Sequence, residues 1–151
     1  MKRRVIQGIF FTLLGGLTIY PALAEHPDFS GNWQLDVAAS RFGTMAPAES
    51  GNLVISMGSH KLIDISMSTK ASHQERTVDS QWKIDDHFHP IAGDAAGEVL
   101  AKWDGSVLVG KRMTPGGTVE ETRFRLESGG STMTEMIQNG LNVSMLVWHR
   151  Q

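Results

Sequence analysis

Asp85, Asp86, His87 and His89 form the only local concentration of titratable side chains in this sequence. The two histidines would share one face of an extended segment, because side chains alternate along a strand. Histidine is the commonest metal ligand, and methionine sulfur would extend such a site toward Cu(I). However, a turn expected at the two aspartates puts His87 at its edge, and the methionines follow the strand alternation instead of clustering. We therefore predict no metal site and keep His87 and His89 as minor candidates.

The same four residues would be the place to look for acid–base catalysis, which needs polar groups that converge in a cleft. The sequence has no G-x-S-x-G, H-E-x-x-H or phosphate-loop motif. The group is more typical of a solvated hairpin tip. We expect a protein that is not an enzyme and that has no cofactor.

The N-terminus predicts export. Lys2, Arg3 and Arg4 precede an apolar run from Val5 to Tyr20, and a small-residue site, Ala22-Leu23-Ala24, follows. This pattern is typical of a secretory signal peptide. The alternative is an uncleaved anchor, but the run is short for a membrane span, which needs about 20 apolar residues. We predict a cleavable signal peptide at 1–24 and a mature domain at 25–151, periplasmic or secreted.

Composition excludes several classes of partner. The predicted signal peptide holds three of the 14 basic residues and none of the 16 acidic ones, so the mature chain is mildly acidic. We therefore expect no nucleic-acid partner and no membrane association after cleavage. The chain has no cysteine, which excludes disulfides, zinc–thiolate sites and cysteine nucleophiles.

Turn residues recur about every eight to twelve positions after the signal peptide, which is the spacing of an all-β sandwich or barrel. Asp104-Gly105 and Asn139-Gly140 predict type I′ hairpins. Residues 68–96 are less regular, and a long connection at 38–50 is either a lid or an inert surface loop. Because nearly all connections are short, we predict a single antiparallel up-and-down β-barrel of about 8–10 strands.

Alternating apolar residues are expected to line the barrel interior, including Val107, Val109, Val143 and Val147. A barrel of this size is either filled by side chains or hollow enough for one small ligand. Both alternatives remain open from the sequence. The predicted ligand-binding residues are Trp33, Ile55, Met57, Ile65, Met67, Trp82, Trp103, Phe124, Met133 and Met145.

Two stretches resemble a group of small secreted bacterial proteins described as lipocalin-like or calycin-like. The first runs from Asp28 to Trp33 and contains Gly31-x-Trp33, which also matches the general lipocalin signature. The second runs from 85 to 109 and contains Ala101-Lys102-Trp103-Asp104-Gly105. The resemblance implies a β-barrel with an apolar interior.

The resemblance also implies that Trp33 closes the base of the barrel beside an arginine from a late strand, either Arg150 or Arg123. One departure is Asp86, where the group usually has glycine. Aspartate tolerates left-handed backbone better than most residues do, so we expect the turn to survive.

These observations predict an exported lipocalin-like barrel that binds or carries a small hydrophobic molecule without catalysis. The alternative is a filled β-barrel that acts as a protein-interaction or envelope structural module. The volume of the interior separates the two, because ligand pockets have volumes of about 300 Å³ or more.

Overall fold

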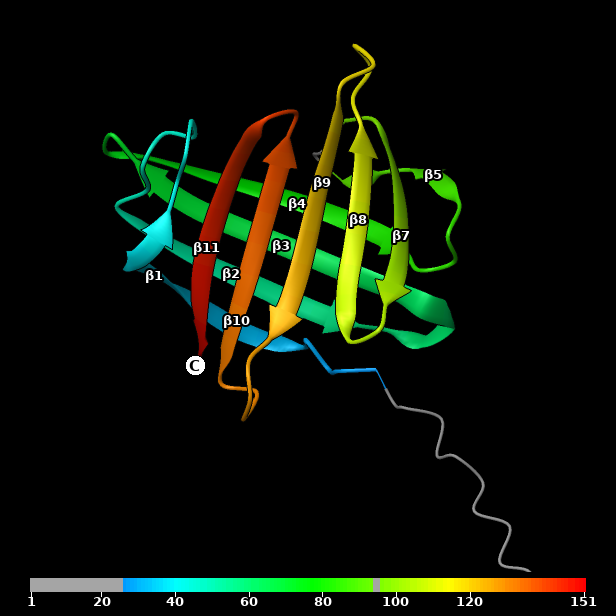
Figure 1. The fold of residues 1–151 in the computed structure, drawn as a ribbon, viewed down its shortest axis with the longest axis horizontal. Helices are drawn as coiled ribbons and strands as arrows, with labels where there is room; N and C mark the ends of the chain where they lie inside the picture. Colours follow the sequence, from blue (N-terminus) through cyan, green and yellow to red (C-terminus); the bar gives the residue numbers. More distant parts are fainter. Residues whose placement is uncertain (1–25, 94–95) are drawn as a thin grey trace, which may run out of the picture.

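The computed structural model describes residues 26–93 and 96–151, which form one antiparallel sheet of 11 strands (Figure 1). The predicted signal peptide at 1–24 lies outside the described residues. One short 3₁₀ turn, η1 (Ser59–Lys61), joins β2 to β3. The strands are β1 (Gly31–Arg41), β2 (Ser50–Met57), β3 (Leu62–Ala71), β4 (Gln74–Lys83), β5 (Phe88–Pro90), β6 (Ala92–Gly93), β7 (Glu98–Asp104), β8 (Val107–Met113), β9 (Val119–Leu126), β10 (Thr132–Asn139) and β11 (Asn142–Arg150).

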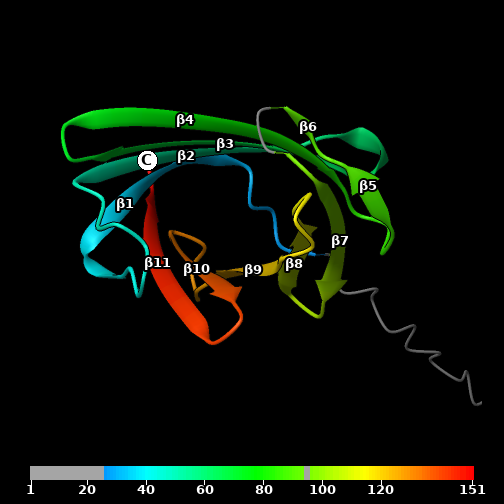
Figure 2. The same ribbon diagram turned by 90° about the horizontal axis from the view of Figure 1, so that it is seen from above.

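The sheet curls into a nearly closed barrel, which confirms the predicted fold class. The strand order is β5-β7-β8-β9-β10-β11-β1-β2-β3-β4-β6, so the first and last long strands pair with each other. Figure 2 shows β2, β3 and β4 as one wall and β7 to β11 as the facing wall. The remaining gap lies between β4 and β7, where a single parallel bridge joins Ile84 to Ala101. The structure has 11 strands, one more than the upper end of the predicted 8–10. Two of these strands, β5 and β6, are only three and two residues long.

Both predicted glycine hairpins exist, but their turn type differs from the prediction. Asp104 pairs with Val107, and Asn139 pairs with Asn142, so each glycine is the first of two turn residues instead of the second. Gly105 and Gly140 have φ of 62° and 61°. Positive φ at the first turn residue alone is the type II′ pattern, in place of the expected type I′.

The predicted inward face of β11 is wrong. When a two-residue turn joins two strands, the numbers of two paired residues add up to an odd number. Paired residues face the same side of the sheet, so inward positions that are odd-numbered on one strand are even-numbered on the next. Met133 is buried on β10, and its partner on β11 is Trp148. Leu146 is therefore inward, whereas Val143 is 48% exposed and Met145 and Val147 face outward. Both faces of this strand are apolar, so alternation alone could not choose between them.

The same rule corrects β8. Leu108 pairs with the inward Trp103, and Gly110 pairs with the inward Ala101. Val107 and Val109 therefore lie on the outer face, although they were expected inside. Val109 is only 1% exposed, but it lies outside the main core cluster. The short-range pattern again failed because apolar residues occupy consecutive positions.

The irregular region at 68–96 contains a long hairpin with no glycine at its turn. Ser72 and His73 join β3 to β4 with φ of 50° and 64°. Positive φ at both turn residues is the type I′ pattern, which usually selects Asn and Gly. Asp86 has φ of 61°, which confirms the predicted turn at that position. The polar sequence of β4 fits its exposure, since only alternate residues near its end are half-buried.

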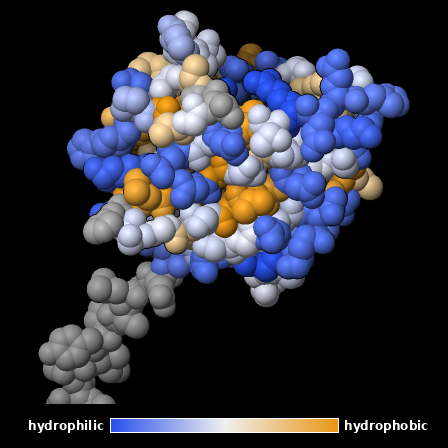
Figure 3. Space-filling view, turned by 180° about the vertical axis from the view of Figure 1, so that it is seen from behind, coloured by the Kyte–Doolittle hydropathy of each residue, from blue (hydrophilic) through white to orange (hydrophobic). Residues whose placement is uncertain are grey.

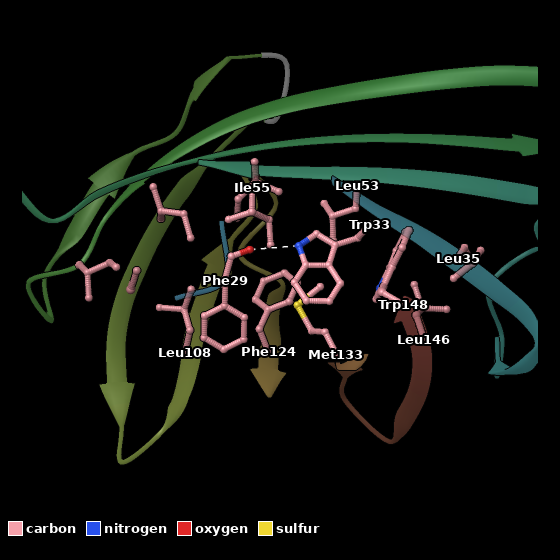
Figure 4. Close-up of a cluster of buried hydrophobic side chains, with 14 of the residues drawn as sticks. Phe29, Trp33, Leu35, Leu53, Ile55, Leu108, Phe124, Met133, Leu146 and Trp148 are labelled. Carbon is pink, nitrogen blue, oxygen red and sulfur yellow. Dashed lines mark hydrogen bonds between the residues drawn. The ribbon is translucent and has the colours of Figure 1, made fainter. Parts of the chain in front are cut away.

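The N-terminal segment at 26–30 closes the base of the barrel. Phe29 is fully buried, and its carbonyl accepts a hydrogen bond from Trp33 Nε1 at 3.0 Å (Figure 4). The Arg150 guanidinium lies 4.4 Å from the Trp33 ring centroid. Arg123 instead pairs with Glu121, so the arginine partner of Trp33 is Arg150.

The connection after β1 is shorter than its sequence predicts, because β1 continues to Arg41. The loop is tied to the barrel at both ends. The Phe42 carbonyl accepts a hydrogen bond from Ser144 Oγ at 2.6 Å, and Ala48 is 8% exposed. Met45, in the middle of the loop, is 40% exposed.

Candidate functional site

A cavity of about 510 Å³ lies inside the barrel, between β3 and β4 on one wall and β8, β9 and β10 on the other. Most of its surface is apolar, and charged side chains enter it from β4, β8, β9 and β10. The lining residues are Ile65, Met67, Arg76, Val78, Ser80, Trp82, Ala96, Arg112, Thr114, Pro115, Glu120, Thr122, Phe124, Glu135 and Ile137.

The opposite end of the barrel interior is filled. Trp33, Trp148 and Met133 are buried at or below 1% exposure and belong to one continuous core cluster (Figure 4). Phe29 and Phe124 pack edge to face with ring centroids 6.4 Å apart. The barrel interior therefore has a packed end near the N-terminal segment. The opposite end, which contains the cavity, is the hollow end.

Trp82 lies at the boundary between the packed end and the hollow end. Its ring centroid is 6.1 Å from that of Phe124, and both residues line the cavity. The ring also lies against the backbone of Gly110, where an added Cβ would come within 2.5 Å of a ring carbon. Glycine at this position gives the indole room to lie flat across β8.

Glu135 is a buried acid in the cavity wall. The residue is 2% exposed, and its Oε2 accepts a hydrogen bond from Trp148 Nε1 at 2.9 Å. Burial raises the pKa of Glu135 to about 7, and the negative charge of Glu120 adds to the shift. Near neutral pH the carboxyl can therefore carry a proton and act as a hydrogen-bond donor as well as an acceptor.

Arg112 and Glu120 form an ion pair on neighbouring strands, with Nη2 and Oε1 3.2 Å apart. The Nε of Arg112 is buried and has no hydrogen-bond partner among the residues that the structure describes. A buried donor without an acceptor is unfavourable by about 1–3 kcal/mol. Arg76 lines the same cavity from β4 but is exposed, so it lies where the cavity opens.

The ten predicted ligand-binding residues fall into four groups. Ile65, Met67, Trp82 and Phe124 line the cavity. Trp33, Ile55 and Met133 belong to the packed end, and Met57 and Trp103 lie half-buried against it. Met145 faces outward, so its predicted place in the interior is wrong.

The polar residues of the cavity, above all Glu135, were not predicted from the sequence. The sequence does contain a pattern that indicates this buried acid. Met133 was expected to face inward, and Glu135 lies midway between it and the apolar Ile137 on the same strand face. An acid at an inward position between two apolar residues indicates a buried carboxyl, since strand side chains alternate with period two.

His87 and His89, the minor candidates for a metal site, lie on the surface near the edge of the barrel. His89 Nε2 is 2.8 Å from Asp85 Oδ1, and Lys83 Nζ is 2.9 Å from Asp85 Oδ2. Hydrogen bonds from Lys83 and His89 hold the pKa of Asp85 well below its ordinary value. Within 26–93 and 96–151 no three His, Asp or Glu side chains are grouped so as to hold a metal ion.

A second hollow lies on the outer surface of β2, β3 and β4, on the face seen in Figure 3. Its surface is mostly apolar, with Val54 and Ala92, and the exposed polar side chains of Asp64, Asp79 and Gln81 border it. Figure 3 shows apolar side chains surrounded by hydrophilic ones on this face. The hollow is open to solvent and has no buried charged group.

No family model and no curated protein sequence matches the chain. Solved structures do match. The fluorescent protein UnaG superposes with a TM-score of 0.62 at 14% identity, over 82% of this chain and 97% of that one. Fatty-acid-binding protein 1 of Echinococcus granulosus gives 0.59 at 12% identity, over 81% and 96%. Lipid binding protein 8 of Caenorhabditis elegans gives 0.55 at 10% identity, over 82% and 95%.

At this identity the likeness shows the fold, a barrel of the kind found in fatty-acid-binding and lipid-binding proteins. The described part of the chain contains no helix of the length and apolarity needed to cross a membrane.

Proposed function

We propose that this protein binds and carries a small hydrophobic molecule in the cavity at the hollow end of the barrel. The observation that supports this most is the cavity itself, with about 510 Å³ between the two walls and a mostly apolar lining. That volume lies within the range of small-molecule sites, about 300–1,000 Å³. A barrel filled by side chains would leave no such space.

The driving force would be removal of apolar ligand surface from water, about 25 cal/mol for each Å² buried before ordering costs. Met67 and Trp82 suit this role, because methionine adapts to varied shapes and the indole offers a large flat surface. Fatty-acid-binding and lipid-binding proteins with the same fold support the proposal by analogy.

We further propose that the protein is non-catalytic and works after export, in the periplasm or outside the cell. The N-terminal pattern of basic residues, an apolar run and Ala22-Leu23-Ala24 supports export. Cell fractionation of the tagged protein tests this: intact residues 1–24 on a cytoplasmic protein would refute it.

Ligand binding is testable through the tryptophans, of which Trp82 lines the cavity. Titration with a panel of long-chain alcohols, fatty acids and retinoids should give saturable quenching for at least one member. Val78→Phe should weaken that binding, since it fills the cavity from β4. Val54→Phe, on the exposed face of β2, is the matched control and should bind normally. No quenching by any ligand, with no adduct in native mass spectrometry, would refute carriage.

The alternative function, a protein-interaction or envelope module, draws support from the outer face of β10 and β11. Met136 and Val143 are 39% and 48% exposed there, and Leu141 at the hairpin tip is fully exposed. If Val143→Ser abolished a biological activity that Val78→Phe left intact, the interaction function would be favoured over carriage.

A further inference from the structure

The charged groups of the cavity are unevenly partnered. Arg112 on β8 is paired with Glu120 on β9. Glu135 on β10 has only the neutral Trp148 indole as a hydrogen-bond partner, and the one described charge that perturbs it is the like charge of Glu120. Arg76 on β4 is exposed at the opening. The inner part of the cavity therefore contains two acids and one arginine that is already engaged.

This balance disfavours an anionic ligand group beside Glu135. A carboxylate placed there would lie beside Glu135, which has no cationic partner among the described residues, in a low-dielectric space where like charges repel strongly. It would also have to leave water, which is unfavourable for an unpaired charge. An ammonium group would need ionised Glu135, and burial opposes that state.

An uncharged oxygen fits the same surroundings. A hydroxyl can donate to the Glu135 carboxylate or accept from its protonated form, and a carbonyl can accept from the protonated form. Arg112 also lines this cavity, and its buried Nε is a donor without an acceptor among residues 26–93 and 96–151. A ligand oxygen would satisfy a buried polar group that the protein leaves unpaired.

We infer that, within the proposed carrier function, the cavity selects an apolar molecule that bears a hydroxyl or carbonyl group over one that bears a free carboxylate or an amine, with Glu135 as the specificity-determining contact. This inference rests on the proposed function and narrows its ligand class. It separates the protein from structural neighbours that bind or transport fatty acids.

Three ligands with the same chain test the inference: dodecanol, dodecanoate and dodecylamine, titrated against the protein by tryptophan quenching near neutral pH. We expect dodecanol to bind about tenfold tighter than either charged ligand, the effect of one hydrogen bond made and one charge penalty avoided. Equal or tighter binding of dodecanoate or dodecylamine would overturn the inference while leaving carriage intact. Failure of all three to bind would overturn both.

Substitution of Glu135 assigns the selectivity to that residue. Glu135→Leu should remove the preference for dodecanol, whereas Glu135→Gln should keep it, because the amide still accepts from Trp148 and still offers a donor. Glu127→Gln, which removes an exposed acid directly after β9, is the control and should change nothing. A preference for dodecanol that survives Glu135→Leu would refute the role of Glu135.

A pH series serves if Glu135→Leu does not fold. An anion beside Glu135 requires its protonated form, so dodecanoate affinity should fall by about tenfold from about pH 6 to about pH 8. Dodecanol affinity should stay constant, and Glu135→Gln should bind dodecanoate with no pH dependence over this range. A flat dodecanoate profile in the unsubstituted protein would contradict the inference.

Discussion

The packed end and the hollow end of the barrel interior share strands β9 and β10 but are lined by different kinds of side chain. On β10, Met133 is part of the packed end, whereas Glu135 and Ile137 face the cavity. On β9, Phe124 lies at the boundary, and Thr122 and Glu120 continue into the hollow end. The backbone ladder is continuous through both ends. The difference therefore lies in side-chain size and polarity, not in the architecture of the sheet.

This comparison shows how a small barrel can be both stable and hollow. The aromatic residues of the N-terminal segment and of β1 and β11 concentrate burial at one end, where Trp33 and Trp148 are at most 1% exposed. The other end then keeps space and buried polar groups, which are unfavourable for stability. Substitutions at the two ends should therefore change the free energy of unfolding in opposite directions or by different amounts.

The largest effect is expected at the packed end. Trp33→Ala should lower the free energy of unfolding by about 3–5 kcal/mol, because it leaves a cavity in a filled core. Met67→Ala at the hollow end should lower it by only about 1–2 kcal/mol, since the methionine already borders empty space. Urea unfolding of both variants measures the difference. Equal losses would contradict the division of the interior into a packed and a hollow end.

The next effect concerns the buried acid at the hollow end. The folded-state pKa of Glu135 is raised to about 7 from 4.5, so the folded state holds a proton that the unfolded state has released. Stability should therefore fall as pH rises from about 4.5 to about 7, by about 3 kcal/mol in total.

Glu135→Gln should remove that loss. The variant should be more stable than the unsubstituted protein by about 3 kcal/mol at about pH 8 and nearly equal to it at about pH 4. Urea unfolding at the two pH values measures this, with Glu127→Gln as the exposed control. A gain that is the same at both pH values would show that ionisation of Glu135 is not its cause.

A smaller effect is expected at the boundary. Gly110→Ala would bring a methyl group against the Trp82 ring, so the ring must move. Because Trp82 borders the cavity, it has room to move, and the loss of stability should be about 1–2 kcal/mol, at the lower end for overpacking. The displaced ring would narrow the cavity and weaken ligand binding. Thermal unfolding and the quenching titration check both, and a stable variant with unchanged binding would contradict the boundary role of Trp82.

The smallest effect is expected at the base. Arg150→Met removes the cation from the Trp33 ring and the donors to the Asp28 and Ser30 carbonyls. We expect a loss of about 1 kcal/mol, typical of a cation–π contact at an exposed arginine. Ligand affinity should not change, because Arg150 lies at the packed end. Weaker binding in this variant would mean that the two ends are coupled.

The alternation of apolar residues and the spacing of turns were sufficient to predict an antiparallel barrel. Local chemistry also located the turn at Asp86, which adopts the left-handed backbone that the resemblance implied there. The type I′ turn at Ser72 and His73 could not be predicted, because neither residue is typical of it. At β8 and β11 the inward face was predicted wrongly, since apolar residues on both faces made the alternation ambiguous.

By itself the sequence determined the fold class, most of the hairpins and the apolar character of the interior, because these depend on properties that repeat within a few residues. Only the tertiary structure decided which strand faces look inward and which part of the interior is empty. Those features depend on the register of paired strands and on the volumes of side chains that meet from opposite walls. Glu135 joins Trp148 and the cavity only once β10 and β11 are paired and the barrel has curled around them.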